Sequence, residues 1–245
     1  MISKNQAKFI RSLHDKKTRN EEWLFLVEWE KSLVELLNSD FLVELLVISE
    51  DFFVKHRNLV SKYTYEIEKT DELTKLSTLG TNTYGIAVVV QKENKVLENN
   101  GNEMILMFDE IKVPGNLGTI VRIADWYGIT KIILSEVSVE FYNPKVIIST
   151  MGSFTRVQTF YTNLEKFLET NTLPVYWAFM DGENVHKMSF SKNWYLVIWN
   201  ESKGIGKELE KYITKKITIP RIGWAESLNA GVATAVILDN IKRDE

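Results

Sequence analysis

Short apolar runs alternate with amphipathic stretches through the first part of the chain. Runs rich in β-branched and aromatic residues predict strands, and apolar residues spaced three or four apart predict helices. The predicted strands are 24–28, 42–49, 64–68 and 84–91, and the predicted helices are 31–39, 51–62 and 71–78. Asp71 is expected to be the N-cap of the last of these helices. The order βαβαβαβ is that of a small α/β domain.

The second part of the chain continues the alternation after a polar stretch, 93–102, which has no apolar period at its end and predicts a linker. The apolar run 103–111 predicts a strand buried on both faces. Further predicted strands are 131–135, 156–160, 174–180, 195–199 and 216–220, and the predicted helices are 114–128, 144–151 and 228–243. We therefore expect one α/β domain over 1–92 and a second over 103–245, with no internal repeat.

Composition places the chain among ordinary soluble globular proteins, with 44% hydrophobic and 26% charged residues. No apolar run is long enough to span a bilayer, and the N-terminus lacks the apolar core of a secretory signal. The chain has no Cys and three scattered His, which excludes disulfides and thiolate metal sites and argues against a His-built zinc site. We expect a cytoplasmic protein that needs no metal.

The net charge of −3 hides a strong asymmetry along the chain. Residues 1–20 carry +5, so the remaining residues carry −8. We call residues 1–20 the basic arm. A basic segment in an otherwise acidic chain suits local binding of a polyanion, although a solvated helix face would show the same charges.

Parallel strands joined by helices bind ligands in the loops at their carboxyl ends, where four loops carry unusual residues. In 113–128, Pro114, Gly115, Asn116 and Gly118 predict a tight turn into a helix, and Arg122 lies one turn further along. This loop lacks both the dinucleotide GxGxxG and the Lys-Ser/Thr of a P-loop. A plain helix start with a surface arginine would look the same.

The other three loops are 141–157, 196–209 and 219–238. The first has Asn143-Pro144 at a helix start and Thr150, Gly152 and Ser153 near its end, which a capped helix also explains. The second places Glu201 directly after a buried strand, where a carboxylate points to function. In the third, Ser227 and Asn229 precede an apolar helix, and Ser227 is the expected N-cap.

Together the order and spacing of these loops resemble the signature of the SpoU (TrmH) branch of the SPOUT RNA methyltransferases. The matching segments are N-x-G-x-x-x-R, Y-N-P-K…T-M-G-S, L-V-I-x-N-E and I-P…E-S-L-N-x-x-V-A, within about 103–240. The first half resembles that family's substrate-binding domain, which is similar to ribosomal RNA-binding proteins, in LFLVEWEKSLVELL, LTKLSTL and YGIAVVV. The resemblance implies a deep C-terminal trefoil knot and a homodimer that completes each site.

The resemblance implies methyl transfer from S-adenosylmethionine to a ribose 2′-hydroxyl of RNA, with ribosomal RNA favoured over transfer RNA. Its catalytic positions correspond to Arg122, Asn116, Glu201, Ser227 and Asn229. A guanidinium is a poor general base, so Arg122 is expected to clamp a phosphate and stabilise the developing alkoxide. Asn116 would contact substrate, Glu201 would orient the ribose or anchor Arg122, and Ser227 and Asn229 would position Arg122 or the phosphate.

The cofactor positions of the family correspond to Trp199, Ile219 and Leu228, with Thr150 as an addition. The basic arm is expected to hold RNA phosphates through Lys8, Arg11, Lys16, Lys17 and Arg19.

Three tryptophans depart from the family pattern. Trp199 and Ser202 replace glycines of Gly-Asn-Glu-Gly, Trp29 stands where glycine follows Val-Glu, and Trp224 stands where small or basic residues are usual. Three interpretations remain open: an active enzyme with a reshaped pocket, a catalytically impaired RNA-binding homologue, or glycine codons read as tryptophan. A nucleotide hydrolase or a dehydrogenase is disfavoured because the Walker lysine and the GxGxxG fingerprint are missing.

Overall fold

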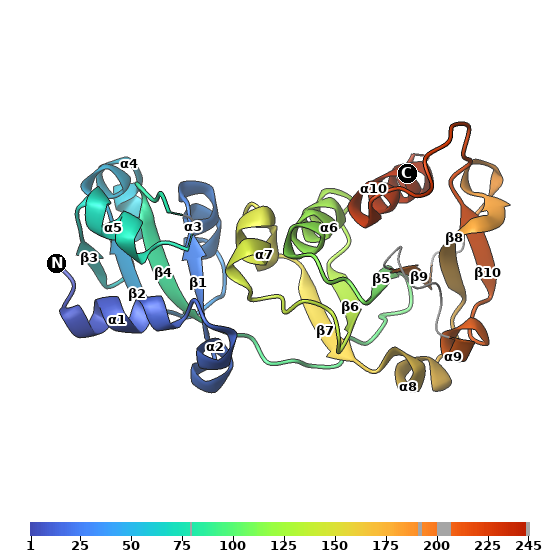
Figure 1. Cartoon of the computed structure of the whole chain (residues 1–245), viewed down its shortest axis with the longest axis horizontal. Coiled ribbons are helices and arrows are strands. Elements are labelled where there is room, and N and C mark those ends of the chain that lie inside the picture. Colours follow the sequence, from blue (N-terminus) through green and yellow to red (C-terminus); the bar gives the residue numbers. More distant parts are fainter. Residues whose placement is uncertain (79, 191–192, 200–206, 244–245) are drawn as a thin grey trace. The chain divides into compact units, whose positions relative to one another are not determined.

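A computed structural model of the protein describes every residue of the chain except 79, 191–192, 200–206 and 244–245. The chain divides into two compact units (Figure 1). The first unit comprises Met1–Glu93 and Phe141–Thr155, and the second comprises Asn94–Glu140 and Arg156–Glu245. Among the described residues, no helix is long and apolar enough to cross a membrane.

The first unit is built on a four-stranded mixed sheet with the order β1-β4-β2-β3. Strand β4 runs antiparallel to β1 and β2, whereas β2 and β3 are parallel. The strands are β1 (Leu24–Glu28), β2 (Val43–Ile48), β3 (Tyr65–Ile67) and β4 (Gly85–Val90). The helices are α1 (Lys4–Ser12), α2 (Lys16–Glu22), α3 (Glu30–Leu37), α4 (Glu50–Val60), α5 (Thr70–Leu76), α7 (Pro144–Ser149) and the short η1 (Ser153–Thr155).

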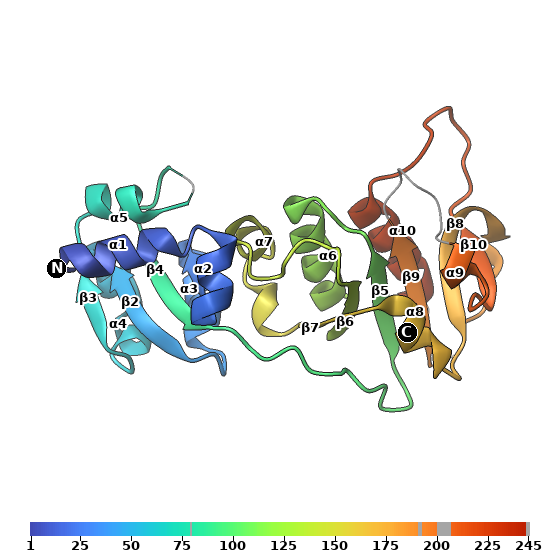
Figure 2. The same cartoon turned by 60° about the horizontal axis from the view of Figure 1, so that its bottom comes forward.

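The four strands predicted for the first part of the chain are all present, but two helices were missed. Helices α1 and α5 lie over the same face of the sheet (Figure 2). Ile10 of α1 and its C-cap residue Leu13 are buried there with Leu73 and Leu76 of α5. Basic residues are interspersed with the few apolar residues of α1 and α2, so the apolar spacing that predicts a helix was not recognised there. The expected N-cap Asp71 was wrong, because α5 begins one residue earlier and its N-cap is Lys69.

Segment 141–155 packs within the first unit, although we expected it in the domain spanning 103–245. Its Tyr142 and Phe154 rings join Phe25 and Phe41, with centroid separations of 4.5–6.1 Å. The Tyr142 hydroxyl accepts a hydrogen bond from the Lys92 backbone N–H at 2.9 Å, and burial raises the pKa of Tyr142 to about 12. Burial of these aromatic rings accounts for the placement, which hydrophobic periodicity could not show.

The second unit contains a six-stranded sheet with the order β10-β8-β9-β5-β6-β7, in which every neighbouring pair is parallel. Its strands are β5 (Met104–Asp109), β6 (Lys131–Ser135), β7 (Gln158–Thr162), β8 (Val175–Asn184), β9 (Trp194–Trp199) and β10 (Lys215–Thr218). Its helices are α6 (Pro114–Trp126), α8 (Leu164–Glu169), η2 (Val185–Lys187), α9 (Lys207–Glu210) and α10 (Ala230–Lys242). The strands and long helices expected here are all present.

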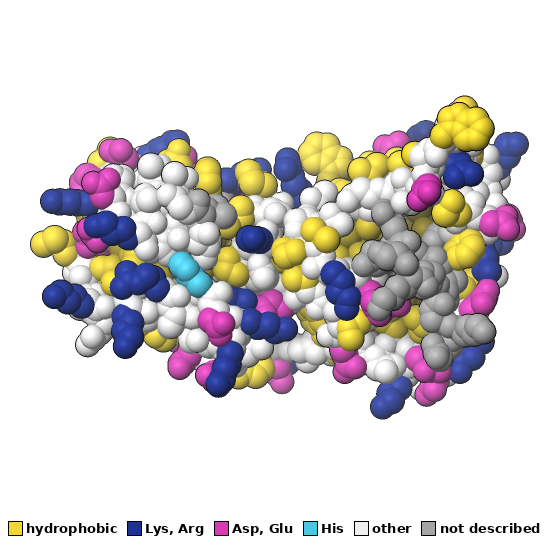
Figure 3. All heavy atoms as spheres, viewed as in Figure 1, with side chains coloured by type: hydrophobic (Ala, Val, Ile, Leu, Met, Phe, Trp, Pro, Cys, Tyr) yellow, Lys and Arg dark blue, Asp and Glu magenta, His cyan; other side chains and the backbone are white. Residues whose placement is uncertain are grey.

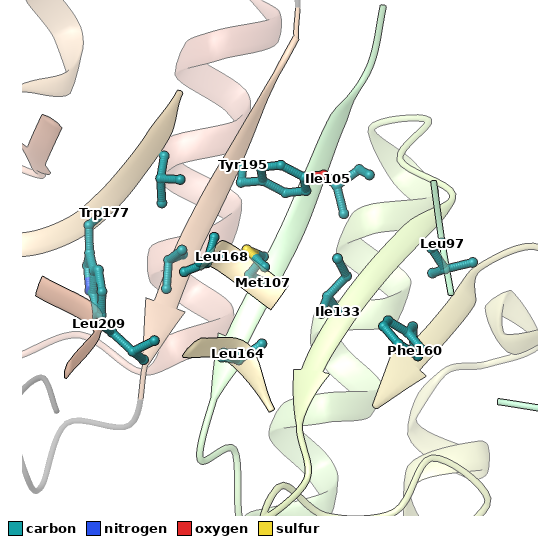
Figure 4. Packing of buried hydrophobic residues seen from close by; sticks show 12 residues of the cluster. Leu97, Ile105, Met107, Ile133, Phe160, Leu164, Leu168, Trp177, Tyr195 and Leu209 are labelled. Carbon is teal, nitrogen blue, oxygen red and sulfur yellow. The ribbon is translucent and has the colours of Figure 1, made fainter. Parts of the chain in front are cut away.

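Apolar residues cover both faces of this parallel sheet. Ile105 and Met107 of β5 face one layer, which includes Leu164 and Leu168 of α8 (Figure 4). Leu106 and Phe108 alternate with these residues along β5, so they face the opposite side of the sheet, and both are completely buried. Burial on both faces explains why 103–111 shows a continuous apolar run in place of alternation.

Trp29 links β1 to α3 with a backbone conformation that favours glycine. Its φ is 77° and its ψ is 143°, and it is the N-cap of α3 without a side-chain capping bond. A side chain in this region costs about 1–3 kcal/mol, because its Cβ crowds the neighbouring backbone. The indole is 43% exposed, so its burial recovers only part of that cost.

We predict that Trp29→Gly raises the free energy of unfolding by about 1–2 kcal/mol, because glycine adopts this conformation without strain. Denaturant unfolding of the purified protein measures the change. Trp29→Ala is the matched control: it removes the indole but keeps the Cβ, so it should give no such gain.

Equal stabilisation by both variants would show that the indole, and not the backbone, causes the strain. The mass of the peptide that contains residue 29, taken from the native protein, tests directly whether that codon is read as tryptophan or glycine.

Candidate functional site

The order of the strands predicts where the second unit binds a ligand. From β5 the chain continues to β6 and β7 on one side, while β9 and β8 lie on the other side of β5. In open parallel sheets, ligands bind at the carboxyl ends of the strands where the direction of winding reverses. Here that point lies between the ends of β5 and β9, where Asp109 is the register partner of Trp199.

A well-anchored turn follows β5 at this point. Glu110 has a left-handed backbone with φ 52°, which is uncommon outside glycine and is often found at functional sites. Two hydroxyls hold the turn: Ser135 Oγ accepts from the Glu110 N–H at 2.8 Å, and Ser138 Oγ accepts from the Ile111 N–H at 3.2 Å. The turn therefore gives α6 a defined starting position.

Helix α6 carries two of the predicted catalytic residues. Pro114 is its first residue and Val113 is its N-cap, so the predicted strand-to-helix turn is present. Asn116 lies in the first turn and is half-buried. Arg122 lies further along and is exposed, so its guanidinium is accessible.

A hydrogen bond joins two predicted catalytic residues that are far apart in the sequence. Asn229 Nδ2 donates to Asn116 Oδ1 at 3.0 Å. The Oδ1 atom of Asn229 accepts from the Gly231 and Val232 N–H groups, so Asn229 caps α10. A Cβ added to Gly231 would lie 3.2 Å from Thr119 Cγ2, which shows how closely α10 starts against α6.

The expectation that Ser227 caps α10 was wrong, since Asn229 takes that role. Both residue types are good N-caps, and sequence alone does not decide which of two neighbours the backbone places at the helix start. Ser227 and Leu228 are exposed within 221–229, which has neither helix nor strand. Ile219 is half-buried, just after β10.

Three other predicted residues contribute less to this geometry. Glu201 lies outside the described residues, and Trp199 is described only as the last residue of β9. Thr150 is completely buried in the first unit, and its hydroxyl donates to the Ile147 carbonyl at 2.6 Å. The Thr150 hydroxyl therefore bonds to the end of α7, of which Thr150 is the C-cap.

The predicted RNA-binding arm forms α1 and α2, and Lys and Arg side chains gather over α1 in Figure 3. Lys4, Lys8 and Arg11 are exposed at helical spacing on one face of α1. None of the three has an acidic partner among the described residues. Lys16 and Lys17 are exposed in the first turn of α2.

Arg19 differs from the other basic residues of the arm. It is buried, and its guanidinium donates to the carbonyls of Leu13 and His14 at 3.0 and 2.8 Å. The structure therefore gives Arg19 a role in joining α1 to α2, which the charge pattern could not distinguish from a surface role.

Asp109 is a residue of this site that the sequence analysis missed. It ends the buried strand β5, and burial, followed by repulsion from Glu110, raises the pKa of its carboxyl against the lowering effect of the Ser135 hydroxyl. Sequence reasoning could not select Asp109, because the predicted strand 103–111 placed it inside the strand, whereas β5 ends at Asp109. Among the described residues, no group of three or more His, Asp or Glu could hold a metal ion.

Comparison with known proteins agrees with this arrangement. The model of the SpoU rRNA methylase family matches residues 103–239. The chain belongs to the SpoU rRNA methylase family. The model of the MRM3-like substrate-binding domain matches residues 4–87, which confirms the second part of the predicted resemblance.

Individual relatives match over nearly the whole chain. The 23S rRNA (guanosine(2553)-2′-O)-methyltransferase RlmP of Bacillus subtilis is 26% identical, over 98% of this chain and 97% of its own. The structure of a TrmH-family RNA methyltransferase from Porphyromonas gingivalis is 31% identical with a TM-score of 0.86, and the match covers all of both chains. The AdoMet-bound rRNA methyltransferase from Sinorhizobium meliloti has a TM-score of 0.87 at 24% identity, covering 100% of this chain and 96% of its own.

We predict that Asn229→Ala lowers the free energy of unfolding by about 1–2 kcal/mol, because it removes both the α10 cap and the bond to Asn116. Chemical denaturation measures the loss. Asn229→Asp keeps an oxygen for the cap but removes the donated N–H, so it should lose less stability than Asn229→Ala.

Ser227→Ala is the matched control two residues away, and it should change stability by less than about 0.5 kcal/mol. A loss on Ser227→Ala as large as that on Asn229→Ala would contradict the assignment of the cap to Asn229.

Proposed function

We propose that this protein transfers a methyl group from S-adenosylmethionine to a ribose 2′-hydroxyl of ribosomal RNA. Family membership supports RNA methylation, and the relative from B. subtilis supports a ribose of 23S rRNA. The observation that carries the proposal is the Asn116–Asn229 hydrogen bond. It joins the helix bearing Arg122 to the start of α10, close to the carboxyl edge of the parallel sheet.

The chemistry needs placement and charge stabilisation more than a strong base. The cofactor supplies the methyl group when it is bound. Arg122 is exposed, and its guanidinium would bind the phosphate beside the target ribose and stabilise the developing negative charge on the 2′-oxygen. That phosphate accepts the hydroxyl proton. Asn116 and Asn229 keep the two helix starts together so that Arg122 is held in position.

The cofactor would lie against Trp199, Ile219 and Leu228. Trp199 ends β9 and Ile219 follows β10, so both positions lie at the carboxyl ends of parallel strands, where such sheets bind ligands. Leu228 is 44% exposed beside the cap of α10, which leaves it free to contact a ligand. Glu201 would orient the ribose and Ser227 the phosphate. Thr150 does not belong to the proposed site, because it is buried and its hydroxyl donates to the Ile147 carbonyl of α7.

The first unit would bind RNA as the substrate-binding domain. We propose that 1–92 serves this role, that 93–102 connects it, and that 103–245 carries the transfer activity. The exposed stripe of α1 supports this division, because unpaired cations on one helix face suit a phosphate backbone. Lys8, Arg11, Lys16 and Lys17 form the proposed RNA surface, from which Arg19 is excluded by burial.

The second unit would form a homodimer and contain a trefoil knot. Large apolar side chains remain exposed along α6, α10 and the segment before α10, including Trp126 at 84%, Ile222, Trp224 and Val232. Large apolar side chains exposed to this extent suit a partner interface. The knot is proposed from the resemblance to the SPOUT methyltransferases.

We predict that Arg122→Ala lowers methyl transfer about 10²- to 10³-fold, because a charged group that acts on the transition state is lost. The measurement is incorporation of labelled methyl groups into ribosomal RNA, followed by mass-spectrometric mapping of the 2′-O-methylated nucleotide. S-adenosylmethionine binding, measured by calorimetry, should stay within a few-fold of wild type.

An active Arg122→Ala protein would overturn the role of Arg122. Absence of cofactor binding by wild type, with binding restored by Trp199→Gly, would instead identify a homologue whose pocket is blocked.

We predict that the double variant Lys8→Ala, Arg11→Ala weakens RNA binding and makes its salt dependence shallower. Losing two phosphate contacts should reduce the slope of log K against log salt by about 1.4, given ~0.7 per contact with single strands. Fluorescence anisotropy with a ribosomal RNA fragment at several salt concentrations measures this slope. Lys62→Ala, an exposed lysine after α4, should leave the slope unchanged; equal slopes for all three proteins would exclude α1 from the interface.

A further inference from the structure

Asp109 occupies the central position at the carboxyl edge of the second sheet. It is the last residue of β5, with β6 on one side and β9 on the other. Because side chains alternate along a strand, Asp109 shares the sheet face of Ile105 and Met107. Its register partner Trp199 ends β9, which places this carboxylate beside the proposed cofactor position.

Asp109 forms no ion pair among the described residues, and Lys112 only attracts its carboxyl from a distance, which lowers the pKa of Asp109 less than burial raises it. Its side chain is partly buried. Ser135, at the end of β6, provides a neutral hydroxyl. The nearest cation along the chain, Lys112, pairs with Glu110 at 3.7 Å. A partly desolvated carboxylate of this kind gains most from a ligand that brings positive charge.

The turn after β5 keeps Asp109 in this position. Its neighbour Glu110 turns away in a left-handed conformation, with its backbone N–H donated to Ser135 Oγ. Ser135 Oγ and Ser138 Oγ are 3.0 Å apart and share a hydrogen bond, so both turn-anchoring hydroxyls are themselves fixed. The backbone that carries Asp109 is therefore fixed before a ligand binds, which lowers the entropic cost of binding.

We propose that the Asp109 carboxylate contacts the positively charged sulfonium group of the methyl donor and makes the site prefer the donor over its demethylated product. This inference rests on the proposed function. In the transfer, the ribose 2′-oxygen forms a bond to the methyl carbon, and the methyl–sulfur bond breaks with its electron pair left on sulfur. The hydroxyl proton leaves to the neighbouring phosphate. The sulfur loses its positive charge in the same step, so the attraction to Asp109 is present before transfer and absent afterwards.

This role gives Asp109 two effects on the reaction. It strengthens binding of the donor through charge attraction in a partly desolvated site, where such attraction exceeds its value in water. It also favours release of S-adenosylhomocysteine, whose sulfur is neutral. A residue with a purely structural role would affect both ligands to the same extent.

The test compares the two ligands on the same proteins by isothermal titration calorimetry. We expect wild type to bind S-adenosylmethionine about tenfold more tightly than S-adenosylhomocysteine, which corresponds to about 1.4 kcal/mol. Asp109→Asn, which keeps the size of the side chain and a partner for Ser135, should reduce this preference to about twofold or less. Its affinity for S-adenosylhomocysteine should stay within about twofold of wild type.

Two further variants complete the design. Glu110→Gln removes a neighbouring carboxylate and should leave the preference unchanged, while Asp109→Glu keeps the charge and should retain most of it. If Asp109→Asn fails to fold, Asp109→Ser provides a smaller neutral side chain for the same comparison. A preference that survives neutralisation of Asp109, or equal losses for both ligands, would overturn the inference. Failure of wild type to bind either ligand would count against the proposed function itself.

Discussion

The parallel pairing of β5 between β6 and β9 is the constraint on which the rest of the second unit depends. Because all six strands run in the same direction, their carboxyl ends lie at one edge of the sheet. The loops leaving that edge contain the turn into α6, the end of β9 and the residues that follow β10. Apolar burial on both faces stabilises the sheet that positions these loops.

Helices α6 and α10 carry or begin at the residues that we propose act in methyl transfer, namely Asn116, Arg122 and Asn229. Asn229 serves two purposes with one side chain: its oxygen caps α10, and its N–H group bonds Asn116. Gly231 lies close to α6, since an added Cβ would be 3.2 Å from Thr119 Cγ2. The same two helices leave apolar residues exposed, among them Trp126 and Val232.

In the first unit, two tryptophans adopt backbone conformations that favour glycine, which costs conformational free energy. Trp23 and Trp29 flank β1, with φ values of 55° and 77°. Trp23 ends α2 in the left-handed conformation that glycine usually provides at that position. Trp29 is also the position where the family pattern has glycine, so the structure and the pattern agree on the backbone requirement. At both positions the chain keeps a backbone conformation that glycine adopts easily but carries a tryptophan side chain there.

The sequence by itself determined the positions of the strands and long helices and the motif positions of Asn116, Arg122 and Asn229, because hydrophobic periodicity and residue spacing are local properties. It did not determine which cap α10 uses, that Arg19 is buried, or that Tyr142 and Phe154 pack with Phe25 in the first unit. It also overlooked Asp109, whose significance comes from its neighbours on β6 and β9. These features depend on contacts between residues distant along the chain, and only the tertiary structure decided them.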